Sequence, residues 1–282
     1  MNAKLVHEPT VIVVAKMELD WDGLNQMVEW LATYRPECLP DYTATGYDLF
    51  PHDLTEDVAE GVSRTLTDNE LLAELAGRSC YHSYGRKAGR RTNSEYIQNM
   101  LERDIPHASV AYHAKMTFFI AGVSRRVSHE LIRHYVGADR DEEGSPSQES
   151  TRYTEHPGHF AVPPRVIDDG MQGDFAMRMT LGYQAYRDYL ALATKNYREQ
   201  HGVNPKGLER KRIYEAAAGL LPMQACTSLV WTTNPVALAK LLKERANEGA
   251  DREFQRLAYK WKDIVLERWP NVMKPLLGQT DS

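Results

Sequence analysis

A long amphipathic pattern between Asp174 and His201 constrains the fold more than any other feature of the chain. Apolar and polar residues alternate there at the spacing of an α-helix. The pattern carries four tyrosines: Tyr183, Tyr186, Tyr189 and Tyr197. It stops at Gly202–Gly207, where Asn204 and Pro205 break a helix. The segment therefore predicts one long helix, which has to pack along one face.

Shorter elements are predicted on both sides of this helix. Helical spacing indicates further helices at Asp20–Arg35, Thr67–Ala76, Asn93–Glu102, Ser124–Tyr135, Arg210–Leu221, Pro235–Asn247 and Asp251–Arg268. Val11–Val14 is β-branched and continuous, which predicts a buried strand. Met116–Ala121 fits a strand or the buried start of a helix, and the pattern does not decide between them. Turn-forming and charged residues predict connections at Pro36–Asp53, Arg78–Arg91 and Asp139–Ser147.

Composition places the chain among ordinary globular proteins. It has 282 residues, 42% of them hydrophobic, and its candidate functional residues lie in both the middle and the last third, so we expect one domain over 1–282. The three cysteines form no Cys-x-x-Cys pair, which favours reduced thiols in a cytoplasmic protein. A formal net charge of -5 argues against nucleic-acid binding. With no signal-peptide or membrane-spanning pattern, we expect no membrane association.

Two neighbouring clusters in the middle of the chain are suited to an anion. Arg133 and His134 stand near the end of a predicted helix, where they fit a phosphate or simply the helix dipole. After an acidic loop come Gln148, Ser150, Thr151 and Arg152, which suit a phosphate-binding turn. Taken alone, each cluster also fits an ordinary surface segment. Their adjacency favours a shared anionic ligand.

Two further groups of polar residues complete the candidate site. His107 and His113 lack a cysteine or acidic residue at metal spacing, so we expect hydrogen bonding and no metal. Asn234 opens a predicted helix that carries Lys240 and Arg245, which by themselves are typical of a solvated cationic face. The chain contains no Gly-x-Gly-x-x-Gly and no Walker loop. A bound nucleotide or flavin would therefore be held without these phosphate-binding fingerprints.

Together these blocks resemble the flavin-dependent thymidylate synthases, the ThyX family. The resemblance rests on the order and spacing of several short motifs across about residues 65 to 265. These are His107-Ala108-Ser109-Val110 with His113, Gly122-Val123-Ser124-Arg125, Ser128-His129-Glu130-Leu131 leading into Arg133-His134, Ser145 to Tyr153, Leu221-Pro222, and Val230-Trp231-Thr232 with Asn234. Residues 1–60 lie outside the clear match.

The resemblance implies an α+β fold and a reaction. The ThyX-like fold has a mixed or antiparallel sheet flanked by long helices, in a single domain that forms homotetramers with active sites at subunit interfaces. Such an enzyme uses FAD, with NADPH and methylenetetrahydrofolate as co-substrates, to methylate C5 of dUMP and give dTMP. ThyX-like enzymes of nucleoside-antibiotic pathways act on UMP. A non-catalytic flavin- or nucleotide-binding homologue remains the alternative.

The resemblance also implies residue roles. It assigns nucleotide binding to Glu130, Gln148, Ser150, Thr151, Arg152 and Arg245, and among these it gives the catalytic positions to Ser150 and Arg245. It places the flavin beside His107, Ser109, Arg133, His134, Tyr135, Arg140, Asn234 and Lys240. Arg152 is expected on the phosphate, and Arg245 opposite the uracil carbonyls, where it would stabilise negative charge.

The chain departs from the family pattern at several of these positions. Tyr135 stands where the family has Arg, and an acidic insertion follows it from Val136 to Gly144. Arg140, inside that insertion, either replaces the missing guanidinium or points to solvent. A phosphate-binding Arg of the family falls on or beside Ala218, Lys240 takes an Asn-like position, and Gly249 stands where a His is usual. We therefore expect altered specificity around the ribose and phosphate.

Overall fold

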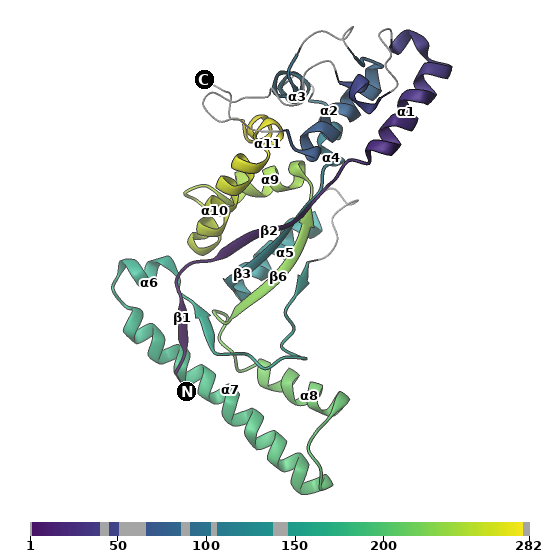
Figure 1. Cartoon of the computed structure of the whole chain (residues 1–282). Helices are drawn as coiled ribbons and strands as arrows, with labels where there is room; N and C mark the ends of the chain where they lie inside the picture. Colours follow the sequence, from purple (N-terminus) through teal and green to yellow (C-terminus); the bar gives the residue numbers. More distant parts are fainter. Residues whose placement is uncertain are drawn as a thin grey trace. The chain divides into compact units, whose positions relative to one another are not determined.

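The structure, a computed structural model, describes residues 2–39, 45–50, 66–85, 91–102, 106–137 and 146–278 (Figure 1). The chain forms two compact units, each assembled from separate stretches. The first unit contains 1–12, 118–231 and 245–259, and the second contains 13–117, 232–244 and 260–282. Whether these units make one domain stays a prediction.

The strands confirm the mixed sheet that the resemblance implied. They are β1 (Lys4–Val6), β2 (Thr10–Lys16), β3 (Met116–Ser124), β4 (Ser147–Gln148), β5 (His159–Ala161) and β6 (Cys226–Thr233). Four of them form a sheet in the order β2-β3-β6-β4, in which β4 and β6 are antiparallel. β1 and β5 form a separate parallel pair, with Lys4 opposite His159. The structure thus selects the strand for Met116–Ala121.

The strand predicted at Val11–Val14 is present in β2, but the prediction that it is buried is wrong. Val11 is 7% exposed, whereas Ile12 is 49% and Val14 is 52% exposed. β2 is the outer member of its sheet. A strand at a sheet edge has a neighbour on one side only, so its β-branched side chains are less covered.

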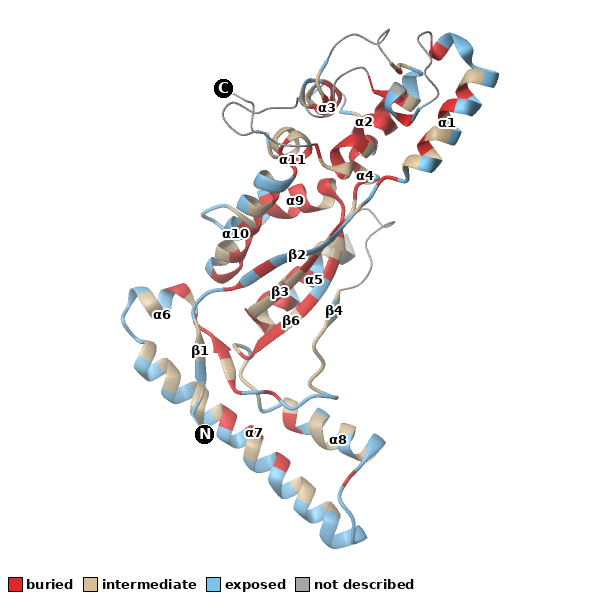
Figure 2. Ribbon diagram, in the orientation of Figure 1, coloured by how far each residue is buried: buried red, intermediate tan, exposed pale blue. Residues whose placement is uncertain are grey.

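The first unit is built around the long predicted helix. It contains α5 (Arg125–Gly137), α6 (Pro164–Asp168), α7 (Gln172–His201), α8 (Gly207–Ala218) and the start of α10 (Arg252–Arg268). One face of α7 is buried through Tyr183, Tyr186 and Leu190, while most of the helix is exposed (Figure 2). These side chains pack with Phe160, Ala217 and Ala225. The predicted helix over Asp174–His201 is therefore confirmed.

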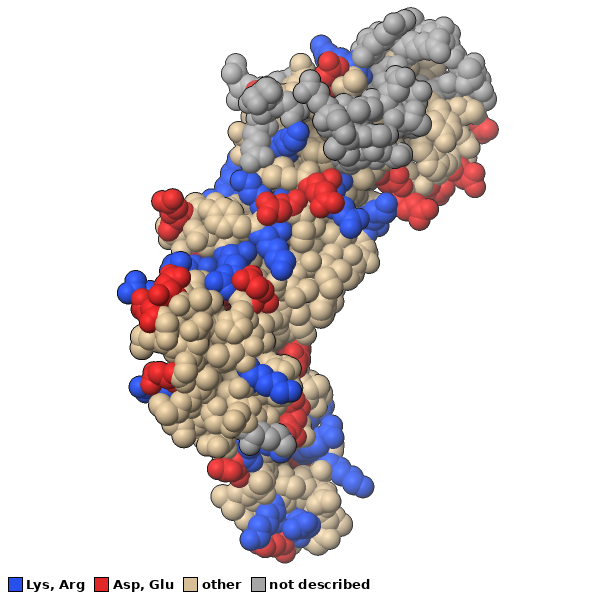
Figure 3. Space-filling view, turned by 60° about the vertical axis from the view of Figure 1, so that its left-hand side comes forward, with Lys and Arg blue, Asp and Glu red and all other residues tan. Residues whose placement is uncertain are grey.

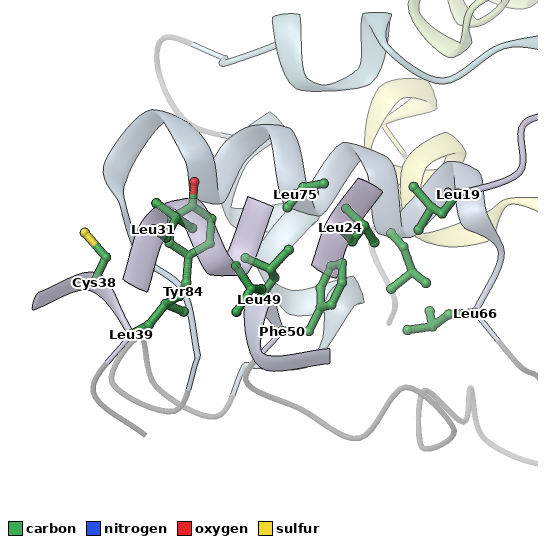
Figure 4. Packing of buried hydrophobic residues seen from close by; sticks show 12 residues of the cluster. Leu19, Leu24, Leu31, Cys38, Leu39, Leu49, Phe50, Leu66, Leu75 and Tyr84 are labelled. Carbon is green, nitrogen blue, oxygen red and sulfur yellow. The ribbon is translucent and has the colours of Figure 1, made fainter. Parts of the chain in front are cut away.

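The second unit has its own hydrophobic core. Its helices are α1 (Trp21–Tyr34), two 3-10 turns, η1 (Pro36–Cys38) and η2 (Gly46–Leu49), α2 (Asp68–Tyr81), α3 (Asn93–Leu101), α4 (Ser109–Tyr112), α9 (Pro235–Arg245, up to Glu244), the end of α10, and α11 (Pro270–Leu277). Leucines from α1, α2 and the turns gather around Leu49 and Phe50, as Figure 4 shows. The loop predicted at Pro36–Asp53 holds these two 3-10 turns, and 40–44 and 51–53 lie outside the described residues.

The connection predicted at Arg78–Arg91 is wrong at its start. α2 continues to Tyr81, and the Arg78 side chain is only 1% exposed. Its Nε donates to Oε1 of Glu74 at 2.7 Å, one helical turn earlier, and its guanidinium lies 4.3 Å from the Tyr96 ring centroid. A charged side chain can be buried when it has an internal partner, and Glu74 is that partner for Arg78. The positive charge of Arg78 therefore does not end the helix. Residues 86–90 lie outside the described part of the chain.

Candidate functional site

Arg245, Glu130 and His134 form a compact cluster in the first unit. The Arg245 Nε–H donates to Nε2 of His134 at 2.8 Å, and its Nη1 lies 3.2 Å from Oε2 of Glu130. The Phe254 ring covers the guanidinium, with its centroid 5.1 Å from Arg245 Cζ. Arg245 and Glu130 side chains are 19% and 23% exposed. The structure therefore brings Arg245 to Glu130 and His134, which lie one helical turn apart on α5 and more than a hundred positions earlier in the sequence.

This contact sets what each member of the cluster can do. Because Nε2 of His134 accepts from Arg245, the proton of a neutral His134 ring sits on Nδ1. The Phe254 ring also meets the His134 ring edge-on, at 5.8 Å between centroids. Arg245 is thus held by a hydrogen bond, an ion pair and a ring face. A guanidinium held in this way is a preorganised donor for a developing negative charge.

Gln148 is held in the sheet by two hydroxyl groups. Its Nε2 donates to Ser128 Oγ at 3.0 Å and to Thr227 Oγ1 at 3.1 Å. Antiparallel pairing with β6 sets Gln148 opposite Leu229. Both amide protons are used in these bonds, so the carbonyl oxygen Oε1 is the atom that Gln148 can offer to a ligand.

A tight turn follows β4 and carries Ser150, Thr151 and Arg152. The Ser150 carbonyl accepts from the backbone N–H groups of Tyr153 and Thr154, both at 3.1 Å. The Arg152 N–H donates to Ser150 Oγ at 3.3 Å, which leaves the hydroxyl proton of Ser150 to donate elsewhere. Thr151 is half-buried, and Arg152 is exposed. The turn presents hydroxyl groups and one guanidinium, as the sequence predicts.

Helix α8 supplies side chains to this turn. Arg152 Nε lies 3.1 Å from Oε2 of Glu215, and Lys211 Nζ lies 4.4 Å from the centroid of the Tyr153 ring. Lys211, Glu215 and Ala218 are spaced by four and then three positions, so they share one face of α8. The two charged members bring opposite charges to the turn. Sequence reasoning gave neither Lys211 nor Glu215 a role.

Four predicted flavin contacts belong to the second unit. Asn234 is buried and its Oδ1 accepts from the backbone N–H of Ala237 at 2.8 Å, at the start of α9. The half-buried His107 ring lies 3.2 Å from the Tyr81 hydroxyl through Nε2. Ser109, at the start of α4, and Lys240, on α9, are exposed. Asn234 therefore has a helix-capping role that the sequence analysis did not assign.

Of the remaining predicted flavin contacts, Arg133 and Tyr135 lie near the end of α5. The Arg133 side chain is exposed and forms no hydrogen bond or ion pair with the residues that the structure describes. Tyr135 lies in α5, but its side chain is outside the described part. Arg140 and the acidic segment 138–145 also lie outside it. An exposed guanidinium that the described residues leave unpaired suits a phosphate ligand.

Two buried groups of the first unit have strongly shifted pKa values. Burial raises the pKa of the Cys226 thiol to about 12, so this thiol stays protonated at neutral pH and is a poor nucleophile. Burial lowers the pKa of His156 to about 4. His156 Nδ1 accepts from the Gly158 N–H at 3.1 Å, so Nε2–H donates to the Cys226 carbonyl at 3.2 Å. His156 is therefore a neutral structural residue.

Surface charge and metal ligands complete the description. On the face in Figure 3, basic and acidic side chains are interspersed. Within the described residues, no group of three or more His, Cys, Asp or Glu is placed to hold a metal ion. In the same part of the chain, no helix combines the length and apolar character needed to cross a membrane.

Comparisons with known proteins match most of the chain to one family. The family model "Thymidylate synthase complementing protein" matches residues 62–271. The chain is 36% identical over 191 residues to a flavin-dependent thymidylate synthase of Mycobacterium sp. (strain KMS), covering 66% of this chain and 72% of the relative. It is 34% identical over 204 residues to the same enzyme of Mycolicibacterium vanbaalenii, covering 71% and 77%.

Two solved structures share the fold. A UMP/dUMP methylase, PolB, from Streptomyces cacaoi, bound with 5-Br UMP, aligns with a TM-score of 0.59 at 17% identity and covers 98% of this chain and 97% of its own. Thymidylate synthase X from Helicobacter pylori, with FAD and dUMP, aligns with a TM-score of 0.52 at 20% identity and covers 74% and 94%. At these identities the likeness concerns the fold alone.

Proposed function

This chain belongs to the family of thymidylate synthase complementing proteins, the flavin-dependent thymidylate synthases, and from that premise we propose that it methylates C5 of a uridine monophosphate. The observation that carries the proposal is the Arg245 guanidinium, held by His134, Glu130 and Phe254. A fixed, partly desolvated cation stabilises negative charge on uracil carbonyl oxygens better than a mobile one in water.

The nucleotide would lie between the Arg245 cluster and the turn after β4. Gln148 Oε1 and the Ser150 hydroxyl would meet the base, and Arg152 the phosphate. Glu130 would contact the nucleotide while keeping Arg245 in place. Thr151, half-buried in the same turn, would add a hydroxyl. Ser150 touches the pyrimidine in this arrangement and is, with Arg245, the second proposed catalytic residue.

The donor set of the chain fits FAD. Arg133 offers a guanidinium without a protein partner among the described residues, and Lys240 and Ser109 offer exposed polar groups. We assign the flavin to these residues with His107, His134, Tyr135, Arg140 and Asn234. Reduced flavin supplies the hydride when bound, with NADPH as its reductant and methylenetetrahydrofolate as the carbon source. The protein's own part is to bind, orient and stabilise charge.

We also propose a homotetramer that acts in the cytoplasm. α7 exposes Met177, Leu181, Tyr189 and Leu192, by 54%, 59%, 39% and 57%, on a helix that is otherwise packed on one side only. Large apolar side chains gathered on one element mark an interaction surface. Active sites at subunit interfaces would then draw residues from more than one copy of the chain.

A turnover assay tests this function. Purified protein is supplied with FAD, NADPH and methylenetetrahydrofolate, and with either dUMP or UMP. We expect dTMP from dUMP. Product from UMP as well would extend the likeness to the UMP/dUMP methylase beyond the fold. No methylated product from either nucleotide would reject the proposed reaction.

One observation favours a second candidate, a non-catalytic nucleotide-binding homologue. Ala218 stands on the α8 face beside Glu215, so one guanidinium expected at the phosphate is missing. A flavin spectrum that NADPH does not bleach, in a protein that still binds dUMP, would favour this candidate. Bleaching accelerated by NADPH would favour the enzyme.

A further inference from the structure

Arg126, the second residue of α5, lies among three carboxylates of the first unit. Its Nη2 lies 3.0 Å from Oδ1 of Asp251 and 3.0 Å from Oε2 of Glu253. Its Nη1 also pairs with Asp251, and lies 3.5 Å from Oε1 of Glu130. The Arg126 side chain is 34% exposed and that of Glu253 is 10% exposed. Partial burial makes these interactions stronger and less screened than those of a free surface pair.

Glu130 is therefore shared between two arginines. Its Oε1 faces Arg126 at 3.5 Å, and its Oε2 faces Arg245 at 3.2 Å. A carboxylate that faced Arg245 alone would neutralise most of that positive charge. A second guanidinium on the opposite oxygen competes for the same negative charge. Arg245 is then less compensated, and its charge remains available to a ligand.

The start of α10 fixes both sides of this arrangement. Asp251 Oδ1 accepts from the backbone N–H groups of Glu253 and Phe254, both at 3.1 Å, so Asp251 caps the start of α10. The same carboxylate pairs with Arg126 and so connects α10 to α5. Glu253 Oε1 accepts from the Ser124 N–H at 2.9 Å, directly before α5. Phe254, the next residue, packs its ring on Arg245 and His134. One helix terminus thus orients Arg126 and Arg245 together.

We propose that Arg126 is a positioning residue for the methylation, which acts through Glu130 on the charge and orientation of Arg245. The proposal rests on the proposed function of the site and adds a residue to which the sequence analysis gave no role. Arg126 is not one of the residues that we propose to contact the nucleotide. Its effect on the reaction therefore depends on Glu130, and that dependence can be measured.

A double-mutant cycle measures it. Arg126→Gln is made in the wild-type protein and in a Glu130→Gln protein, and kcat and KM for dUMP are compared. In the wild-type background we expect kcat to fall about fivefold to tenfold, with KM raised by only about threefold, as for coupled charged neighbours. In the Glu130→Gln background we expect the same substitution to change kcat less than about twofold. An equal loss in both backgrounds would overturn the proposal.

Matched variants separate positioning from a purely structural role. Arg126→Lys keeps the charge without the planar fork, so we expect it to recover part of the lost kcat. Arg252→Gln removes an arginine from the same end of α10 that pairs with Asp168 on the exposed surface, and should leave kcat unchanged. Loss of melting temperature with no dependence of kcat on the Glu130 background would show that Arg126 only anchors α5 to α10.

Measuring dUMP binding separates the test of Arg126 from the test of the proposed reaction. The same cycle is measured on the dissociation constant of dUMP, where we expect Arg126→Gln to raise it about threefold only when Glu130 is present. A wild-type protein that binds dUMP without turnover would reject the proposed reaction, and the binding cycle would still decide the role of Arg126. A wild-type protein that binds no uridine nucleotide would overturn both.

Discussion

Glu215 forms an ion pair with Arg152, the residue whose guanidinium we propose to bind the nucleotide phosphate. The Arg152–Glu215 pair spans 3.1 Å, with side chains 54% and 58% exposed. Ion pairs this exposed contribute about 0.2–1 kcal/mol. A phosphate dianion, which offers several acceptor oxygens, forms stronger charge-assisted bonds with the same fork. Nucleotide binding would therefore displace Glu215.

Substitutions at this pair should change nucleotide affinity in opposite directions. Arg152→Ala removes a charge-assisted contact and should raise the dissociation constant of dUMP about tenfold to a hundredfold. Glu215→Gln removes the competing charge and should lower it about twofold to fivefold. Titration calorimetry measures both. Arg212→Ala, which breaks an exposed pair with Glu209 on the same helix, is the control. Wild-type affinity in Arg152→Ala would refute the phosphate role.

His156 should make the stability of the protein depend on pH. Burial lowers its pKa from 6.5 to about 4 in the folded state. A neutral buried His stabilises the fold fully above its unfolded pKa, and this stability is lost as pH falls from about 6.5 towards 4, by about 3 kcal/mol in total. Urea unfolding of wild type and His156→Gln at several pH values measures it. The variant should lose less stability over this window, and equal slopes would contradict the assignment.

Single elements show where local sequence patterns succeed and fail. Periodicity found α7, because its buried face repeats Tyr183, Tyr186 and Leu190 at helical spacing. It missed β6, an inner strand of the sheet, because the Thr and Ser residues of this segment interrupt its apolar pattern. It ended α2 too early, because Arg78 looked like a solvent-exposed charge. A buried ion pair depends on partners that no local pattern displays.

The network around Arg78 should be costly to break. Glu74 accepts from Arg78 Nε at 2.7 Å and from Asn93 Nδ2 at 2.8 Å, and all three side chains are buried. Removing one partner of a buried pair leaves an uncompensated charge, so Glu74→Ala should lower the free energy of unfolding by about 3–5 kcal/mol. Denaturant unfolding of this variant measures it. The double variant Glu74→Leu/Arg78→Met should be less destabilised than Glu74→Ala, and a greater loss would contradict a cost that comes from the unpaired charge.

At the scale of the whole molecule, the site draws on residues that the sequence places far apart. The ThyX resemblance singled out Glu130, His134 and Arg245, and the fold places their side chains in contact. It gave no hint of Arg126, Glu215 or Phe254, since their roles arise from how α8 and α10 pack on α5 and the turn after β4. The described part of residues 1–60, which precede the matched residues 62–271, adds β1, β2 and α1.

Assembly through α7 is open to a direct test. Leu181 lies on the exposed face of the helix, at 59% exposure, so Leu181→Glu should leave the isolated chain folded and oppose its burial against a second copy. Sedimentation analysis should show a homotetramer for wild type and smaller species for the variant. Arg198→Glu, at an exposed position of α7 away from Leu181, is a charge control. An unchanged tetramer in Leu181→Glu would place the subunit contacts elsewhere.

The most direct test of the account is the turnover number of an Arg245→Gln enzyme that has been shown to contain its flavin. Arg245 is the group that we propose for the uracil oxygens, and the structure gives its guanidinium a fixed and partly buried position. Loss of one such donor should lower kcat about a hundredfold to a thousandfold with dUMP saturating. A flavin-loaded Arg245→Gln enzyme that turns over dUMP at the wild-type rate would contradict the assignment of this cluster as the active site.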